Sequence, residues 1–226
     1  MFWQDPQFGE RLITMMAALV LVLQIMMVAQ RGLVTNIRAF GLQSFLLAAI
    51  AATIAHFNHA PHIYVVAALT LIFKAILLPL VLERLVAKIE IRLEIEPFLN
   101  VPVSVIVSGF LTLLGYVVAE SFHRPEEAGP ASLGHNTLAV AIALFLIGFF
   151  MMINRRKALT QVLALLCLEN GLFLAAISLT FGMPLIVEAG IFFDVLVATL
   201  LLAILIYRIR ETFDSMDVSR LSRLKG

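Results

Sequence analysis

The chain has 226 residues, of which 62% are hydrophobic and 14% are charged, and its formal net charge is +1. Soluble domains carry about 25% charged residues, so this composition excludes an ordinary soluble domain and indicates a multi-pass membrane protein. The single cysteine, Cys167, excludes an intramolecular disulfide, and the lack of any Cys/His cluster excludes a structural zinc site or an iron–sulfur cluster within this chain.

Apolar runs of about 18 residues or more predict helices that span a membrane. Seven such runs predict an all-α polytopic membrane protein with transmembrane helices at 12–30, 39–57, 62–83, 98–120, 135–153, 158–181 and 185–207. Pro79 falls inside the third span, and we expect it to kink the helix because proline cannot donate a backbone hydrogen bond.

The longer linkers are 84–97 and 121–134, and the first has an unusual pattern. From Lys88 to Glu96, charged and apolar residues alternate strictly, which is the period of a strand. Three interpretations stay open for this segment. It is a short strand that pairs with a neighbouring subunit, a helix at the membrane interface, or a solvated linker whose apolar residues rest on lipid.

Basic residues predict the orientation in the membrane. With seven spans, thirteen of the 16 Lys and Arg residues lie on the side opposite the N-terminus, and Arg11 and Arg124 lie on the N-terminal side. Because cytoplasmic loops are enriched in Lys and Arg, we expect the C-terminus in the cytoplasm and the N-terminus outside. A bacterial or archaeal cytoplasmic membrane is the expected location.

Glu169 is the most informative residue of the predicted spans. It lies twelve residues beyond the basic cluster 155–157, which at about 1.5 Å per residue is close to the middle of a bilayer. An ionisable group there costs about 2.5–3.5 kcal/mol on insertion scales, which indicates a proton or ion path. Gln161, two steps of four residues earlier, is expected on the same helix face. The alternative is a protonated Glu169 that only bonds a neighbouring helix.

Two further ionisable residues lie at similar depth. Asp194 follows Pro184 by ten residues, and Lys74 follows His62 by twelve. We expect both to join Glu169 in a proton relay; the alternative for Lys74 is a static ion pair with Glu169 or Asp194. Glu188 lies nearer the outer boundary and is a secondary candidate, either at the mouth of the path or as an interfacial charge.

Other chemistry is not indicated by the sequence. The histidines His56, His59 and His62 are spaced by three, but Pro61 interrupts them and no acidic residue is near, so an interfacial loop is favoured over a metal site. No nucleotide-binding loop, nucleophile elbow or HExxH motif is present. We therefore expect no catalytic residues, no metal, no cofactor and no nucleic-acid partner.

The C-terminal part resembles a known membrane subunit. The basic turn 155–157, the segment 168–170 (Leu-Glu-Asn), the basic helix end 207–210 and the tail 214–219 are similar to NuoK of respiratory complex I. With four additional N-terminal helices, the whole chain resembles the hydrogenase-4 component E family of membrane-bound hydrogenase and formate hydrogenlyase complexes. The segments that carry this second resemblance are 168–171, 184–188 and 193–197.

The resemblance implies two regions: an N-terminal four-helix membrane region, 1–134, and a NuoK-like three-helix unit with a cytoplasmic tail, 135–226. It also implies a proton-conducting, non-catalytic subunit that couples redox chemistry in other subunits to proton translocation. In that role Glu169 matches the first functional glutamate of NuoK, and Asp194 takes the place of the second. The implied partners are antiporter-like membrane subunits, the lipid bilayer and protons.

Two alternatives stay open for the function. One is a structural subunit of the membrane arm whose buried charges form static pairs. The other is a subunit of a multi-subunit cation/proton antiporter, because NuoK-like chains also occur in such assemblies.

Overall fold

The computed structural model describes residues 6–58, 60–88, 97–121 and 135–180. The helices in these ranges are α1 (Pro6–Ala29), α2 (Leu33–Phe57), α3 (Pro61–Leu69), η2 (Thr70–Leu77), α4 (Leu78–Lys88), α5 (Val101–Ser121), α6 (His135–Asn154) and α7 (Ala158–Thr180). Six segments are long and apolar enough to cross a membrane, with α3, η2 and α4 joined into one of them. No strand occurs in the described ranges, which confirms the predicted all-α membrane fold.

Two segments predicted from the sequence fall outside the described residues. The predicted seventh span, 185–207, lies beyond the last described residue, and the alternating strip from residue 89 to Glu96 lies in an internal gap. The helix α4 continues to Lys88, beyond residue 84, where the linker was expected to begin.

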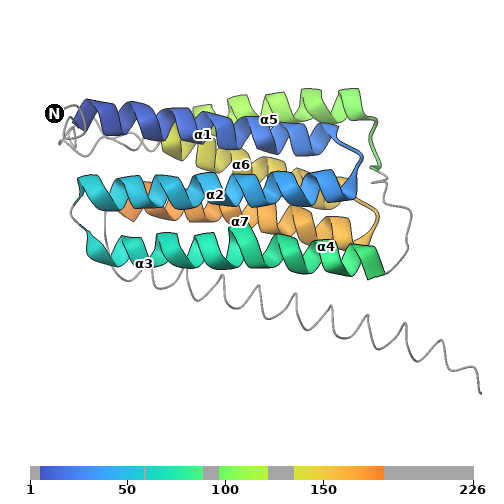
Figure 1. Cartoon of the computed structure of the whole chain (residues 1–226). Helices are drawn as coiled ribbons and strands as arrows, with labels where there is room; N and C mark the ends of the chain where they lie inside the picture. The colour runs from blue at the N-terminus through green and yellow to red at the C-terminus, as the bar shows by residue number, and fades with distance from the viewer. Residues whose placement is uncertain (1–5, 59, 89–96, 122–134, 181–226) are drawn as a thin grey trace, which may run out of the picture. The chain divides into compact units, whose positions relative to one another are not determined.

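The helices lie side by side in two layers within the compact unit 1–188 (Figure 1). One layer holds α1, α2 and the span made of α3, η2 and α4, and the other holds α5, α6 and α7. Contacts of α1 with α5 and α6, and of α2 with α7, join the two layers. The middle of α2 and the middle of α7 are thereby brought together across the bundle.

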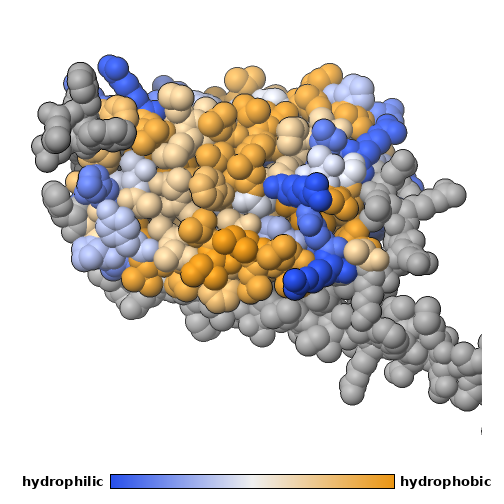
Figure 2. Space-filling model, viewed as in Figure 1, coloured by the Kyte–Doolittle hydropathy of each residue, from blue (hydrophilic) through white to orange (hydrophobic). Residues whose placement is uncertain are grey.

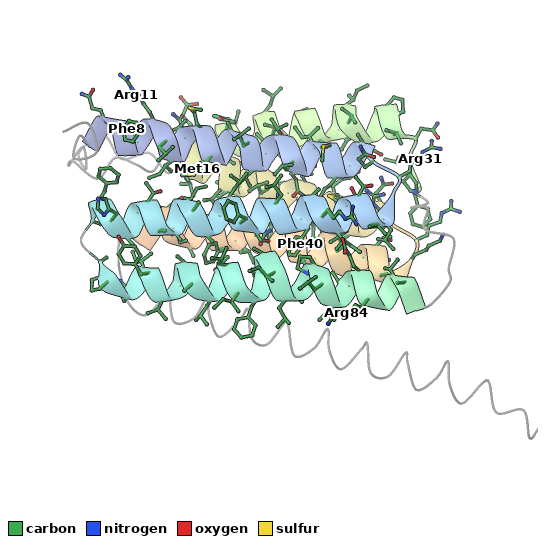
Figure 3. All side chains as sticks on the ribbon, in the orientation of Figure 1. Phe8, Arg11, Met16, Arg31, Phe40 and Arg84 are labelled. Carbon is green, nitrogen blue, oxygen red and sulfur yellow. The ribbon has the colours of Figure 1, made fainter. Side chains whose placement is uncertain are left out.

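The outer surface is that of a protein solvated by lipid. Figure 2 shows a largely hydrophobic face between hydrophilic ends. Large apolar side chains on α5 point outward, and Ile106 is 72% exposed. Figure 3 places Arg11 at one end of the helices and Arg31 and Arg84 at the other, in agreement with the charge pattern of the sequence. The hydrophobic middle and charged ends fit a bilayer of ordinary thickness.

The third span changes its helix type at its centre. Residues Thr70–Leu77 form a π-helix, which ends two residues before Pro79. Pro79 cannot donate to the carbonyl group of Ala75 four residues earlier. Gly41 of α2 faces this region, because a Cβ added there would lie 3.0 Å from Pro79 Cγ and 3.3 Å from the Ala75 oxygen.

The π-helix carries polar residues inward and apolar residues outward. Thr70 and Lys74 are each only 3% exposed, whereas Ile72 and Ile76 are more than half exposed. A soluble protein would place the apolar side chains inside and the polar ones outside. In a membrane, the apolar side chains face the lipid and the polar ones face the interior of the bundle. The wide turn therefore presents Lys74 to the interior of the bundle.

Two glycines bring the backbones of α6 and α7 into contact. A Cβ added at Gly148 would lie 2.6 Å from Leu168 Cα, and one added at Gly171 would lie 2.6 Å from the Phe145 nitrogen. Small residues at helix contacts let membrane helices approach closely and gain van der Waals attraction. This close contact on either side of residues 169 and 170 fixes that part of α7 against α6.

Candidate functional site

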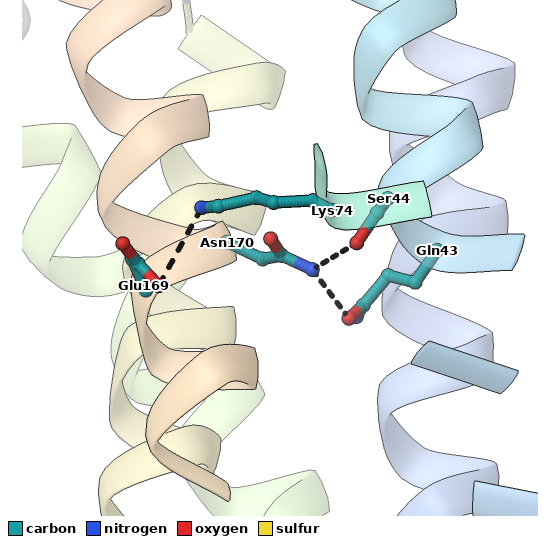
Figure 4. A network of polar contacts seen from close by, with 5 residues as sticks. All are labelled: Gln43, Ser44, Lys74, Glu169 and Asn170. Carbon is teal, nitrogen blue, oxygen red and sulfur yellow. Dashed lines mark hydrogen bonds and ion pairs between the residues drawn. The ribbon is translucent and has the colours of Figure 1, made fainter. Parts of the chain in front are cut away.

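The centre of the site is a buried ion pair between η2 and α7. The Lys74 Nζ atom lies 3.7 Å from Glu169 Oε2, and the two side chains are 4% and 2% exposed (Figure 4). A direct charge-assisted hydrogen bond is about 2.7–2.9 Å long, so the two groups are in electrostatic contact without such a bond. Of the expected partners of Glu169, the structure thus brings Lys74 to it.

An aromatic ring completes the surroundings of the ammonium group. Lys74 Nζ lies 5.6 Å from the centre of the Phe173 ring, one turn beyond Glu169 on α7. A cation near the face of an aromatic ring is attracted by the negative charge on that face. The ring and the carboxylate hold Lys74 in the interior, where its stem is too short to reach an interface.

Next to the ion pair lies a chain of buried amides that the sequence did not single out as a site. Asn170 Nδ2 donates to Gln43 Oε1 at 3.1 Å and to Ser44 Oγ at 3.2 Å (Figure 4). Gln43 Nε2 donates to Gln24 Oε1 at 2.8 Å, and Gln24 Nε2 contacts Met151 Sδ at 3.2 Å. The four residues that these hydrogen bonds join across α1, α2 and α7 are all fully buried: Gln24, Gln43, Ser44 and Asn170.

The sequence contained a signal for this chain of amides. Gln43 and Ser44 lie near the middle of the second apolar span, as Lys74 and Glu169 do in their spans, and Gln24 lies in the second half of the first span. Because they are uncharged, these residues lower the hydropathy of a span only slightly and do not stand out as Lys74 and Glu169 do. Polar side chains within membrane helices commonly bond across helices, which is the arrangement found.

Gln161 lies away from the ion pair. Its side chain is exposed, and its Nε2 donates to the Arg155 carbonyl oxygen at 3.0 Å, at the start of α7. Two steps of four residues rotate by about 80° beyond two full turns, so Gln161 and the buried Glu169 do not share one face. Gln161 instead contributes to the turn between α6 and α7.

That turn is held by a buried arginine. Arg155 Nη2 donates to the carbonyl oxygen of Met27 at 2.9 Å, close to the end of α1. A cation is favourable at the C-terminal end of a helix, where carbonyl groups lack helical partners. Burial lowers the pKa of Arg155 from its usual value. The residue thus ties α1 to the turn that precedes α7.

The other candidates from the sequence are not part of this arrangement. Asp194, Glu188 and His59 lie outside the described residues, and His56 and His62 are exposed. Within the described ranges, no group of three or more His, Cys, Asp or Glu side chains is placed to hold a metal ion.

The site places two opposite charges in an apolar interior. A carboxylate and an ammonium group lie in contact at the middle of the bundle, enclosed by apolar side chains and neutral amides. In such a low dielectric, the interaction of the pair is much stronger than in water.

The chain is similar to bacterial proteins over most of its length. It is 30% identical over 202 residues to the uncharacterized protein Rv0085 of Mycobacterium tuberculosis, covering 89% of this chain and 90% of that protein. It is 25% identical over 220 residues to hydrogenase-4 component E of Escherichia coli K12, covering 96% and 99% of the two chains, and the corresponding protein of Shigella flexneri gives the same values. No family model and no solved structure matches the chain.

Proposed function

The chain belongs to the same family as the mycobacterial protein Rv0085, and we propose that it is a proton-conducting membrane subunit of a hydrogenase-4-like complex. The distant homology to hydrogenase-4 component E extends over nearly the whole chain and supports a membrane subunit of a hydrogenase-like assembly. In this proposal, other subunits carry out the redox chemistry, and Glu169 and Lys74 pass protons within the membrane.

The observation that carries this proposal is the buried ion pair itself. Each charge at the bilayer centre costs about 2.5–3.5 kcal/mol on insertion scales. A buried pair is often replaced by apolar residues of similar volume with no loss of stability. A purely mechanical contact between η2 and α7 therefore has no need of charges, whereas a path for protons requires groups that bind and release them.

The proposal extends to residues outside the described ranges. Asp194 is the next proton-binding group after Glu169 in a NuoK-like C-terminal unit, with Glu188 nearer the mouth of the path. The end of the bundle that carries Arg31 and Arg84 faces the cytoplasm. The partners are other membrane subunits of the complex, and the antiporter-like ones receive or deliver the protons.

The test is the Glu169→Gln substitution in the assembled complex. The amide keeps the shape of the side chain but cannot bind and release a proton, so we expect redox turnover to persist while proton movement across vesicle membranes is lost. Glu83→Gln is the matched control, because Glu83 forms a 2.8 Å salt bridge with the exposed Arg38. Unchanged proton movement in Glu169→Gln would refute the proposal.

The ion pair also supports a second function, that of a structural subunit. The 3.7 Å contact joins η2 to α7, and breaking a buried pair by removing one partner destabilises a fold by about 3–5 kcal/mol. On this alternative, Glu169→Gln lowers the amount of intact complex on native electrophoresis, and each remaining complex moves protons normally. The two functions therefore differ in proton movement per assembled complex.

A further inference from the structure

The amide chain beside the ion pair has a fixed direction. Gln43 Nε2 donates to the backbone carbonyl oxygen of Val20 at 3.3 Å and to Gln24 Oε1 at 2.8 Å. A backbone carbonyl group only accepts hydrogen bonds, so the end of Gln43 that faces it must be the NH2 group. The other end, Oε1, then faces Asn170 and requires a donor there.

This requirement determines the orientation of Asn170. Its Nδ2 donates to Gln43 Oε1 and to Ser44 Oγ, and exchanging the two ends of the amide would set two carbonyl oxygens against each other. The Val20 carbonyl group therefore determines the orientation of the Gln43 amide, and Gln43 in turn determines that of the Asn170 amide. The Asn170 carbonyl oxygen is left on the opposite side.

The Asn170 oxygen is buried and has acceptor capacity to spare. Asn170 is fully buried, and its Oδ1 accepts no hydrogen bond within the part of the chain that the structure describes. Figure 4 shows this oxygen directed away from Gln43 and Ser44, on the side where the Lys74 chain extends toward Glu169. Leaving a buried acceptor unsatisfied destabilises a protein, which makes a polar neighbour or a water molecule at this point favourable.

We propose that Asn170 is a positioning residue whose carbonyl oxygen receives the Lys74 ammonium group, directly or through one water molecule, when Glu169 is protonated. The inference rests on the proposed proton path. A proton that arrives from the path forms an O–H bond on the Glu169 carboxylate, and the negative charge beside Lys74 disappears. The ammonium group then turns to the Asn170 oxygen, and it returns when the carboxyl group releases its proton. Lys74 and Asn170 undergo no net chemical change.

The first test uses substitutions in the assembled complex. Asn170→Leu removes the acceptor, and we expect proton movement per complex to fall about tenfold, since hydrogen bonds to charged groups are stronger than those to neutral ones. Ser178→Ala is the control on the same helix, because its buried hydroxyl group donates to the Leu174 carbonyl oxygen of its own helix, and we expect no change. In a Lys74→Met background, adding Asn170→Leu is expected to have no further effect, because Asn170 acts through Lys74.

The second test needs only the full chain in lipid nanodiscs. The infrared carboxyl band of Glu169, identified by its absence in Glu169→Gln, is expected to change its pH dependence in Asn170→Leu and not in Ser178→Ala. If Asn170→Leu does not fold, Gln43→Leu leaves Asn170 in place but removes the acceptor that orients it, and the same change is expected.

The outcomes separate this inference from the proposed function. Loss of proton movement in Glu169→Gln, with normal movement and an unchanged infrared titration in Asn170→Leu, would overturn the inference and leave the function standing. Normal movement in Glu169→Gln would overturn the function. An altered infrared titration would still support the contact of Asn170 with the ion pair.

Discussion

The contact between α6 and α7 makes Gly171→Ala a sharp test of the fold. The added Cβ would lie 2.6 Å from the Phe145 nitrogen, where ordinary contacts begin at 3.4 Å. The obstacle is backbone and not a side chain that could rotate away. The two helices must therefore separate by about 0.8 Å at this point, which loosens the dispersion contacts around Gly148 as well.

The expected size of the effect follows from two opposing contributions. Forcing a methyl group into a closely packed contact costs about 1–3 kcal/mol. Replacing glycine by alanine within a helix stabilises it by about 0.5–1 kcal/mol. Gly109→Ala is the matched control, because a Cβ on Gly109 of α5 meets no atom within 4 Å and only the favourable contribution applies. We expect the two variants to differ by about 2 kcal/mol, with Gly171→Ala the less stable.

Thermal unfolding can be followed with a thiol-reactive fluorogenic dye. Cys167 is the single cysteine of the chain and is buried, so the dye reports unfolding without any added label. A difference of 2 kcal/mol corresponds to about 4–8 °C in midpoint for a chain of this size. If Gly171→Ala melts at the same temperature as Gly109→Ala, the inferred backbone contact between α6 and α7 is wrong.

The turn between α6 and α7 supports two further predictions. Arg155→Lys is expected to lose about 1–3 kcal/mol in the same melting assay, because a lysine does not reproduce the guanidinium bond to the Met27 carbonyl oxygen, while Arg156→Lys at the exposed neighbouring position changes little. Asn154→Ala removes the side-chain oxygen that accepts a 2.8 Å hydrogen bond from the Leu99 amide, so hydrogen exchange at Leu99 is expected to accelerate about tenfold. An unchanged rate would show that this bond does not hold the segment.

The positions of the spans could be predicted from the sequence because lipid requires long apolar helices. The six described spans agree with the predicted ones to within about six residues. The largest difference is at α2, which begins at Leu33 and not at residue 39. Arg38 interrupts the apolar run in the sequence. In the structure its side chain is exposed and forms a salt bridge with Glu83 of α4.

The ion pair could be predicted only as one of several possible arrangements. Depth in the membrane placed Lys74 and Glu169 at a similar level, but depth does not determine which helix faces are adjacent. The inward direction of Lys74 depends on the π-helix Thr70–Leu77, and the position of Glu169 depends on the close contact of α6 with α7. Neither the π-helix nor this contact between helices is visible in hydropathy.

The π-helix also has a consequence for how related sequences align. Each ring of a π-helix encloses one residue more than a ring of an α-helix, and in an α-helix one residue corresponds to a rotation of about 100°. A relative in which residues 70–77 formed a regular α-helix would fit the same span with one residue fewer. An alignment without a gap would then match Lys74 with a residue that faces lipid. The equivalent cation should therefore be sought one position away, by its place opposite Glu169.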